Sequence, residues 1–531
     1  MLKHLTHRLL LAALVVLLPL GAAHALTADE ARAIAIGGSA KRVAALNQAV
    51  LDANDKTVAF IDALANGAVR VTDSQVLVMQ DGTQAIDPVT GTVVPLPVDA
   101  QEVINNNYVR GALESAKAVI KLTAKDPAAR LAAARALLSE PNETRLPAIE
   151  KALAAEQDPA VKEQLTLVRA ASMIGSADPA RRIAAVNTLS QNKSPDTKLL
   201  LNQQLAKEQD PKVKTAIQAA IAKVDEALVW GDRLAAAFSG ISLGSVLLLA
   251  ALGLAITYGL MGVINMAHGE LMMIGAYATW FVQGLFRQYV PEAYFGWYLF
   301  AAIPIAFLTS ALVGAILERG VIRFLYGRPL ETLLATWGIS LMLQQLVRST
   351  FGAQNVGVEN PAWMSGGLQV LSNVTLPWNR IYIIVFAVLV LLAVALVIGK
   401  TRLGLFVRGV TQNRPIASCM GVNTARVDTY AFALGSGIAG LAGCALSQIG
   451  NVGPDLGQGY IVDSFMVVVM GGVGQLAGTV YAALGLGLLN KFIEGWSGAV
   501  LAKIAVLVFI IIFIQKRPQG IFAVKGRSAE A

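Results

Sequence analysis

Long apolar runs separated by short polar segments fill the second half of the chain. Nine such runs occur, at residues 238–260, 262–284, 297–317, 330–347, 380–399, 429–449, 461–473, 476–493 and 500–515. Most approach the ~20 apolar residues that a helix needs to cross the hydrocarbon core of a bilayer. The pattern predicts a mainly α protein with a polytopic helical membrane domain over 231–520 and a cytoplasmic tail at 521–531. Glycines interrupt two runs, so eight or nine crossings are expected.

Residues 26–230 have a different pattern, in which apolar residues recur at helical spacing within a charged background. Four Asp-Pro pairs divide this region: Asp126-Pro127, Asp158-Pro159, Asp178-Pro179 and Asp210-Pro211. Asp caps free backbone N–H groups and Pro suits the first helical position, so each pair predicts a helix start. Their spacing predicts paired helices stacked as a HEAT-like α-solenoid. A plain helical bundle acting as a spacer is the alternative.

A short segment rich in β-forming residues lies between a predicted first helix at about 28–65 and the solenoid. Val69 to Val71 and Val76 to Met79 alternate as strands, and Asp81-Gly82 is a hairpin turn signal. Thr92 to Pro97 has the character of an edge strand. We therefore expect a small β-hairpin insert at about 68–98, with nothing in it that resembles a catalytic site.

The N-terminus has the pattern of a secretory signal peptide. Lys3 and Arg8 precede an apolar run from Leu9 to Leu20, and Ala23-His24-Ala25 offers small residues at a cleavage site. The pattern predicts that residues 1–25 are a signal peptide and that residues 26–230 are periplasmic. An uncleaved anchor helix is the alternative, and it exports the same domain.

Composition and charge agree with a membrane protein. Hydrophobic residues make up 55% of the chain and charged residues 15%. The formal net charge is +8, but most of the excess lies between the apolar runs, where Lys and Arg mark cytoplasmic loops. This predicts a cytoplasmic C-terminus and does not indicate nucleic-acid binding. The two cysteines, Cys419 and Cys444, provide no disulfide framework.

Polar residues and glycines break the apolar runs at two places. The residues are Asn265, His268 and Glu270 in the second run and Gly471, Gly472 and Gly474 between the seventh and eighth. Matching breaks in two parts of a transporter point to its substrate path, because irregular backbone in a membrane must be buried in protein or line a cavity. We expect these six residues along such a path. For His268 and Glu270 the alternative is a helix-end cap. No metal site is expected, because His268 is the sole histidine after residue 25.

The segment Gly399-Lys400-Thr401 resembles the end of a phosphate-binding loop, but Val394 stands where that motif requires glycine. The chain is therefore expected to bind no ATP through such a loop, and any ATPase is a separate subunit. The basic loop from Lys400 to Asp428 lies between two predicted spans on the cytoplasmic side. Within it, Pro415 and Gly421 bracket a predicted short helix that suits docking to an ATPase. A solvated loop that merely fixes topology is the alternative.

Five motifs occur in order through the membrane half. They are Tyr258-Gly259-Leu260-Met261-Gly262-Val263-Ile264-Asn265-Met266-Ala267-His268-Gly269-Glu270, Ala417-Ser418-Cys419-Met420-Gly421-Val422-Asn423-Thr424, Ala439-Gly440-Leu441-Ala442-Gly443, Gly471-Gly472-Val473-Gly474 and Arg517-Pro518-Gln519-Gly520. Together they resemble the signatures of the branched-chain amino-acid type ABC permeases. Within that family, the long exported extension and the amino-acid sequences of residues 418–423 and 515–520 resemble the permease subunit of urea ABC transporters.

This resemblance implies a transport permease of the inner membrane that forms the path for urea, with no enzyme activity and no cofactor. It implies four kinds of partner: a second homologous permease, two cytoplasmic ATPase subunits, a periplasmic substrate-binding protein and the lipid bilayer. It places the ATPase coupling loop at Arg414, Ala417 and Gly421. The chain departs from the family at Asn413 and Arg414, where members often have an acidic residue.

Three other functions are open at this stage. The chain resembles branched-chain amino-acid permeases closely enough that an amino acid or another small amide is an alternative substrate. A membrane-anchored periplasmic scaffold fits less well, because an anchor needs one span. An intramembrane enzyme also fits less well, because no convergent set of polar groups is found in the sequence.

Overall fold

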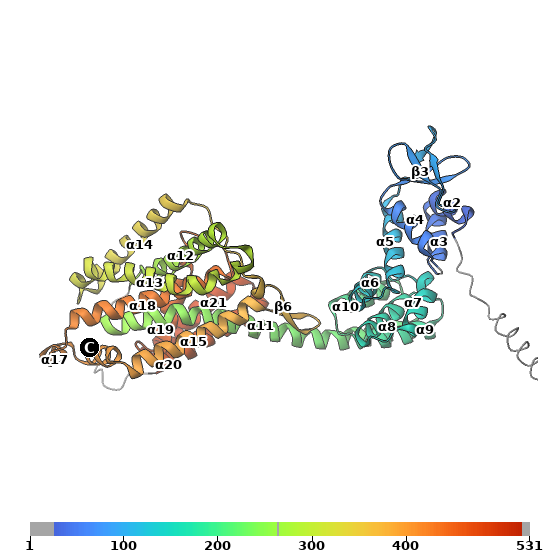
Figure 1. Cartoon of the computed structure of the whole chain (residues 1–531). Helices are drawn as coiled ribbons and strands as arrows, with labels where there is room; N and C mark the ends of the chain where they lie inside the picture. Colours follow the sequence, from blue (N-terminus) through green and yellow to red (C-terminus); the bar gives the residue numbers. More distant parts are fainter. Residues whose placement is uncertain (1–25, 52, 263–264, 523–531) are drawn as a thin grey trace, which may run out of the picture. The chain divides into compact units, whose positions relative to one another are not determined.

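The computed structural model describes residues 26–51, 53–262 and 265–522, and it divides into two compact units between Leu228 and Val229 (Figure 1). The predicted signal peptide, residues 1–25, lies outside the described residues, as does most of the predicted tail.

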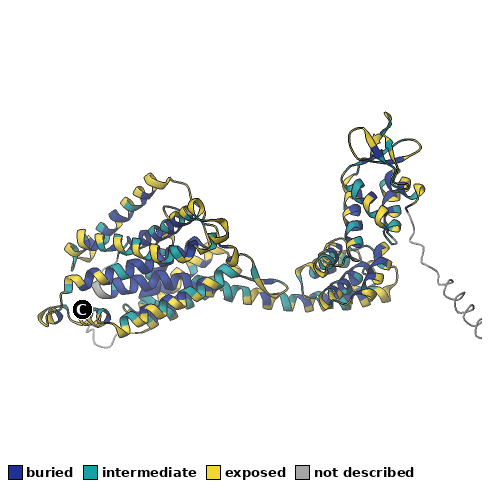
Figure 2. Ribbon diagram, in the orientation of Figure 1, coloured by how far each residue is buried: buried dark blue, intermediate teal, exposed yellow. Residues whose placement is uncertain are grey.

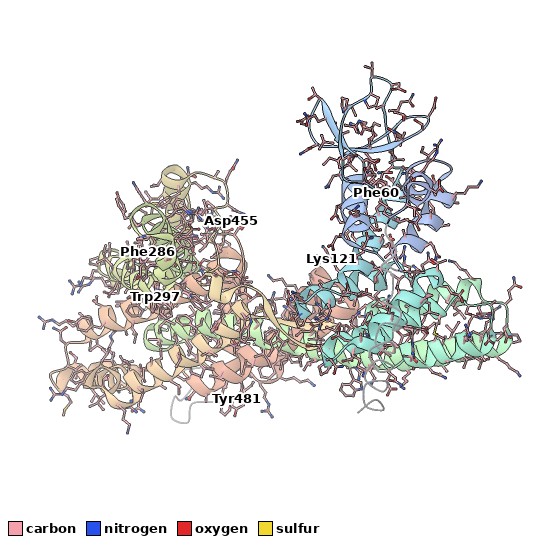
Figure 3. The ribbon with its side chains drawn as sticks, turned by 45° about the vertical axis from the view of Figure 1, so that its right-hand side comes forward. Phe60, Lys121, Phe286, Trp297, Asp455 and Tyr481 are labelled. Atoms are coloured by element: carbon pink, nitrogen blue, oxygen red, sulfur yellow. The ribbon has the colours of Figure 1, made fainter. Side chains whose placement is uncertain are left out.

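The first unit is helical apart from one small sheet. Its helices are α2 (Ala28–Ala35), α3 (Ser39–Ala49), α4 (Asp55–Ala65), α5 (Asn107–Lys121), α6 (Pro127–Ser139), the 3-10 helix η1 (Glu143–Arg145), α7 (Leu146–Ala155), α8 (Pro159–Met173), α9 (Pro179–Leu189), α10 (Pro195–Lys207) and the first part of α11 (Pro211–Met261). Two hydrophobic clusters form its core. Phe60, labelled in Figure 3, is fully buried in the first cluster, and Val213 and Ile217 of α11 are fully buried in the second.

The prediction of one helix at 28–65 is wrong, because α2, α3 and α4 occupy this range. Gly37 has φ of +115°, a left-handed conformation that ends α2 and that residues with a side chain rarely adopt. Asn54 then starts α4, since its side chain accepts a hydrogen bond from the N–H of Thr57 at 2.9 Å. The chain thus turns twice within a range whose apolar periodicity alone predicts one helix.

The segment predicted as a hairpin forms a five-stranded antiparallel sheet. The strands are β1 (Val69–Val71), β2 (Val76–Met79), β3 (Gln84–Ile86), β4 (Val93–Pro95) and β5 (Gln101–Glu102). Their order is β4-β3-β2-β1-β5, so β4, with its proline, lies at an edge. The turn between β2 and β3 is held by Asp81, whose side chain accepts hydrogen bonds from the N–H groups of Thr83 and Gln84. The predicted boundary at 98 is too early, because β5 pairs with β1.

All four predicted Asp-Pro helix starts are confirmed. Each proline is the first residue of a helix, namely α6, α8, α9 or α11. Each aspartate accepts a hydrogen bond from the N–H two residues further on, at 2.8–3.0 Å. The aspartate side chain thus satisfies one of the free N–H groups of the first turn, as capping requires.

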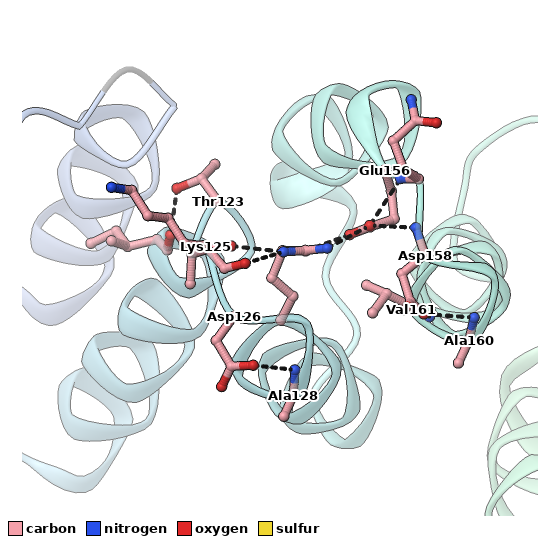
Figure 4. A network of polar contacts seen from close by, with 12 residues as sticks. Thr123, Lys125, Asp126, Ala128, Glu156, Asp158, Ala160 and Val161 are labelled. Atoms are coloured by element: carbon pink, nitrogen blue, oxygen red, sulfur yellow. Dashed lines mark hydrogen bonds and ion pairs between the residues drawn. The ribbon is translucent and has the colours of Figure 1, made fainter.

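Two of these helix starts carry the same network of polar contacts, repeated 52 residues along the chain. Figure 4 shows the first copy, in which the guanidinium of Arg130 donates to both carboxylate oxygens of Glu156 at 2.7 and 2.8 Å. Arg182 and Glu208 form the second copy, at 2.9 and 3.0 Å. In both copies the arginine also donates to two backbone carbonyls, and the glutamate accepts from the two N–H groups that follow it. The network ties the start of one helix to the segment that precedes a later one.

Replacing Glu156 with Gln is expected to lower the Tm of a soluble fragment of residues 26–228 by about 4–8 °C at pH 7, because charge-assisted hydrogen bonds of roughly 2 kcal/mol are lost. Hydrogen bonds from Arg130 lower the pKa of Glu156 to about 2 from 4.5. Ionised Glu156 therefore stabilises the fold above about pH 4.5, and this contribution disappears as the pH falls toward 2. Thermal unfolding followed by circular dichroism should show the difference in Tm shrinking between about pH 5 and pH 3.

The matched control is Asp225→Asn, which removes an ion pair with Lys198 whose two side chains are about 40% exposed. An exposed pair contributes little, so its Tm should change by less than about 2 °C. A Tm for Glu156→Gln equal to that of the wild type at pH 7 would contradict the role given to the network.

The second unit is a bundle of long helices. After α11 its elements are α12 (His268–Tyr289), η2 (Glu292–Trp297), α13 (Tyr298–Gly320), η3 (Ile322–Leu325), α14 (Pro329–Phe351), η4 (Ala362–Met364), β6 (Gly367–Leu371), β7 (Val374–Pro377), α15 (Trp378–Lys400), α16 (Arg402–Gln412), α17 (Arg414–Cys419), α18 (Thr424–Ser447), α19 (Gln458–Gly471), α20 (Leu476–Ser497) and α21 (Ala499–Lys516). The antiparallel β6–β7 hairpin and α16 are not among the predicted elements.

Six helices of the described residues are long and apolar enough to cross a membrane: α11, α13, α15, α18, α20 and α21. The three other predicted spans also form helices. Of these, α12 and α14 are long enough to cross a membrane but not apolar enough, and α19, with 14 residues, is too short. The prediction of a span from 262 is wrong at its start, because α12 begins at His268.

Helices α11 and α18 form the centre of this bundle. The apolar stretches of these two helices are 89% and 83% buried, against 17–33% for the other four candidate spans, and their buried positions are dark blue in Figure 2. Glycines of α18 allow this packing. A methyl group at Gly435 would overlap the backbone of α11, one at Gly440 that of α13, and one at Gly443 that of α12. The motif at 439–443 is therefore a surface of close helix contact.

Candidate functional site

The first break in the apolar pattern places the start of α12 inside the bundle. The imidazole of His268 is fully buried, and its Nε2 lies 3.0 Å from the carbonyl oxygen of Ala250 in the middle of the apolar part of α11. Ala250 precedes the last residue of α11, Met261, by eleven positions, or about 16 Å of helix. Gly262, which follows α11, has φ of +67°, and the start of α12 lies beside the middle of the apolar part of α11 rather than beyond its end.

Asn265 orders the turn that precedes α12, whose own N-cap residue, Ala267, makes no side-chain capping hydrogen bond. Its Oδ1 accepts a hydrogen bond from the N–H of Ala267 at 3.0 Å, and its backbone carbonyl accepts one from the N–H of His268 at 3.3 Å. The side chain is buried, and its Nδ2 has no hydrogen-bond partner within the described part of the chain. The described structure therefore leaves one buried donor of this side chain unsatisfied.

His268 and Glu270 contact different helices. Because a carbonyl oxygen only accepts, His268 donates from Nε2 to α11, and its Nδ1 is left without a partner in the described structure. Glu270 is turned toward α14, where its Oε1 accepts a hydrogen bond from Nε2 of Gln344 at 2.6 Å and its Oε2 is unpartnered among the described residues. The three polar residues of the first break therefore do not converge on one point.

The N-terminus of α19 meets that of α12. Gly457 precedes the first residue of α19, and a methyl group on Gly269 would lie 2.7 Å from its carbonyl oxygen. The bridge between Val356 and Val452, and the packing of Val452 against Met273 and Tyr277 of α12, show that the segment before α19 runs along α12. Two helices thus begin at a common point within the bundle.

The second break, at Gly471, Gly472 and Gly474, is a close-packed turn at the other end of α19. Gly471 lies against the backbone of Gly478 in α20, and Gly259 of α11 lies beside Gly474. Gly472 and Gly474 have φ of +100° and +78°. The chain after α21 covers this turn, since the N–H of Ile521 donates to the carbonyl of Met470 at 2.8 Å. Close backbone contacts explain these glycines, and they do not lie beside His268 or Glu270.

The predicted short helix in the basic loop is confirmed as α17, which begins at Arg414. Asn413 caps it by accepting a hydrogen bond from the N–H of Ile416 at 3.0 Å. Ala417 is buried, and Gly421 follows the helix with φ of +84°. The exposed residues of α17 include Ile416, at 60%, and Met420, which is 79% exposed, directly follows the helix. These two large side chains form an apolar face that no element of the described chain covers.

Sequence reasoning missed Gln344, Ile416, Met420 and Asp428. The signal for Gln344 is a glutamine within an apolar run, and the signal for Asp428 is an acid at the start of another. Residues 394–400, where the sequence lacks the glycine of a phosphate-binding loop, form the end of α15 and not a loop.

A bundle of apolar helices in which two helices begin at an interior point is the architecture of a multi-pass membrane transport protein. Residues 236–515 match the family described as the permease component of branched-chain amino acid transport systems. The chain belongs to this family, whose members normally work with ATPase and binding-protein partners.

Two relatives are similar over nearly their whole length. The high-affinity branched-chain amino acid transport system permease protein LivH of Escherichia coli is 30% identical over 291 residues, which are 54% of this chain and 93% of LivH. The corresponding permease protein BraD of Pseudomonas aeruginosa is 27% identical over 293 residues, 53% of this chain and 93% of BraD. The ribose import permease protein RbsC of Escherichia coli is 27% identical over 143 residues, 26% of this chain and 38% of RbsC. No solved structure matches the chain.

Proposed function

We propose that this chain is one permease subunit of an ABC importer and forms part of the path for a small amino acid or amide. The observation that carries this proposal is the meeting of the α12 and α19 starts inside the bundle, beside a buried amide with a free donor. Broken helices of this kind hold substrate in transporters, because their first N–H groups and the unwound backbone are available for hydrogen bonds.

A branched-chain amino acid is the substrate that the relatives favour. LivH and BraD carry this substrate class in their names and are similar over 93% of their length. The positive ends of two helices suit the carboxylate of an amino acid.

Urea is the second candidate. Residues 26–235 lie outside the family match. This extension and the amino-acid sequences of residues 418–423 and 515–520 are the features that resemble urea permeases. Urea offers N–H donors and a carbonyl acceptor, and Asn265 is able to bond to either substrate.

The remaining parts follow from this proposal. The chain lies in the inner membrane with its C-terminus cytoplasmic and residues 26–228 periplasmic, where the 52-residue repeat of the Arg-Glu network supports a stacked helical solenoid. Arg414, Ala417 and Gly421 belong to the contact with an ATPase, which α17 makes through Ile416 and Met420. ATP hydrolysis takes place on two separate ATPase subunits, and a second homologous permease and a periplasmic binding protein complete the importer.

Uptake of radiolabelled leucine and of radiolabelled urea distinguishes the two substrates. The measurement compares cells that lack this chain with cells in which it is restored, with the partner subunits unchanged. We expect restoration to raise ATP-dependent uptake of one of the two, and unlabelled competitor of the same kind to abolish the increase. Uptake of neither compound above the level of the deletion strain would contradict the proposed substrates.

A further inference from the structure

Five polar side chains form a connected cluster where α17 meets the membrane helices. They are Glu318 of α13, Tyr326 of the α13–α14 connection, Arg414 of α17, and Asp428 and Thr429 of α18, and they are called the Arg414 cluster below. Arg414 forms an ion pair with Asp428, and its guanidinium carbon lies 4.8 Å from the centre of the Tyr326 ring. One side chain of α17 is thus held from two sides.

Glu318 joins the other two members. The hydroxyl of Tyr326 donates to Oε1 of Glu318 at 3.0 Å, and the hydroxyl of Thr429 donates to Oε2 at 2.6 Å. Each carboxylate oxygen of Glu318 therefore has a partner from a different element. Contacts run without a gap from α17 through Asp428 to α18, and from α17 through Tyr326 to α13.

Stability alone does not explain this arrangement. Glu318 and Asp428 are both about 98–99% buried. The free energy needed to remove such charges from water is about as large as the free energy gained by pairing them. Asp428 also has one oxygen, Oδ1, with no partner in the described residues. A buried polar network of this kind fixes the relative position of the elements that it joins more than it adds to stability.

The elements that the cluster joins differ in how firmly they pack on the bundle. The short helix α17 has six residues and an exposed apolar face, so it has little packing of its own to hold it on the bundle. In contrast, α18 packs directly against α11, α12 and α13. A displacement of α17 therefore reaches the α12 start through the cluster and α18.

We infer that the Arg414 cluster is the mechanical link that converts movement of the ATPase-bound α17 into movement of α13 and α18. This rests on the proposed role of α17 as the ATPase contact.

The test uses the complete importer, with its ATPases, in proteoliposomes. Asp428→Asn removes the charge that holds Arg414, and Tyr326→Phe removes one hydroxyl and keeps the ring. Both should lower the amount of substrate transported per ATP hydrolysed about fivefold or more, while the ATPase subunits co-purify at the wild-type level. The control is Arg426→Gln, which removes a positive charge from an exposed side chain of the same segment and should leave the ratio unchanged.

A double variant tests whether the pair acts as a unit. If it does, Arg414→Gln combined with Asp428→Asn is no worse than the poorer single variant. If Asp428→Asn fails to accumulate in membranes, the ratio of transport to ATP hydrolysis in Tyr326→Phe alone tests the inference. A wild-type ratio of transport to hydrolysis in Tyr326→Phe and in any folded Asp428→Asn protein would overturn the inference, as would a loss of ATPase co-purification without a change in that ratio. Failure of the wild-type chain to bind ATPases would instead refute the proposed function.

Discussion

Replacing Gly443 with alanine is expected to remove most of the protein from the membrane. A methyl group at this position would overlap the carbonyl oxygen of Met272 and lie 2.9 Å from the N–H nitrogen of Ala276. These atoms belong to the backbone of α12 and cannot rotate away, so α12 and α18 must separate. Overpacking of a core costs up to about 3 kcal/mol, and a loss of this size lowers the steady-state level of a protein several-fold. Immunoblotting of isolated membranes and thermal unfolding in detergent measure the effect.

The matched control is Gly338→Ala in α14, where no heavy atom lies within 4 Å of the added methyl group. This variant should accumulate at the wild-type level, because alanine is a better helix former than glycine. If Gly443→Ala and Gly338→Ala gave the same membrane level and the same Tm, the close contact of α18 with α12 would be absent from the folded protein.

Replacing Asn265 with leucine is expected to reduce uptake about tenfold. Loss of one hydrogen bond to the substrate costs about 1.4 kcal/mol, which is a tenfold change. Leucine also removes a hydrogen bond of the turn before α12, because Oδ1 accepts from the N–H of Ala267. Asn265→Asp separates the two effects, since it keeps an oxygen for the hydrogen bond to Ala267 and replaces the unpartnered Nδ2 donor.

If Nδ2 contacts the substrate, both variants lose uptake while their membrane level and ATPase binding stay normal. Initial rates of uptake over a range of substrate concentrations provide the measurement. Wild-type uptake in Asn265→Asp with reduced uptake in Asn265→Leu would mean that Asn265 only holds the turn before α12, and its place in the path would have to be abandoned.

The features that the sequence predicts correctly are those with a local cause. An aspartate before a proline caps a helix whatever surrounds it, so the starts of α6, α8, α9 and α11 follow from residue pairs alone. The helix at 414–419 likewise follows from Pro415 and Gly421. By contrast, the division of residues 28–65 into three helices depends on Gly37 and Asn54, whose effects a periodic apolar pattern conceals.

The candidate site depends on contacts between distant residues, and these are not visible in local patterns. The sequence places His268 and Glu270 two positions apart, but the structure turns them toward α11 and α14. The meeting of Gly269 with Gly457 joins residues almost 190 positions apart. Similarly, the pairing of Arg414 with Asp428 requires knowledge of how α17 folds back on α18.

The 52-residue repeat of the Arg-Glu network makes part of the first unit a module. Removing residues 127–178 would join Asp126 directly to Pro179, which restores an Asp-Pro start for α9, and Arg182 would keep its partner Glu208. Inserting a further copy at the same junction would likewise leave every helix start capped. We therefore expect this region to accept insertions and deletions of whole modules, whereas a change of a few residues would separate an arginine from its glutamate.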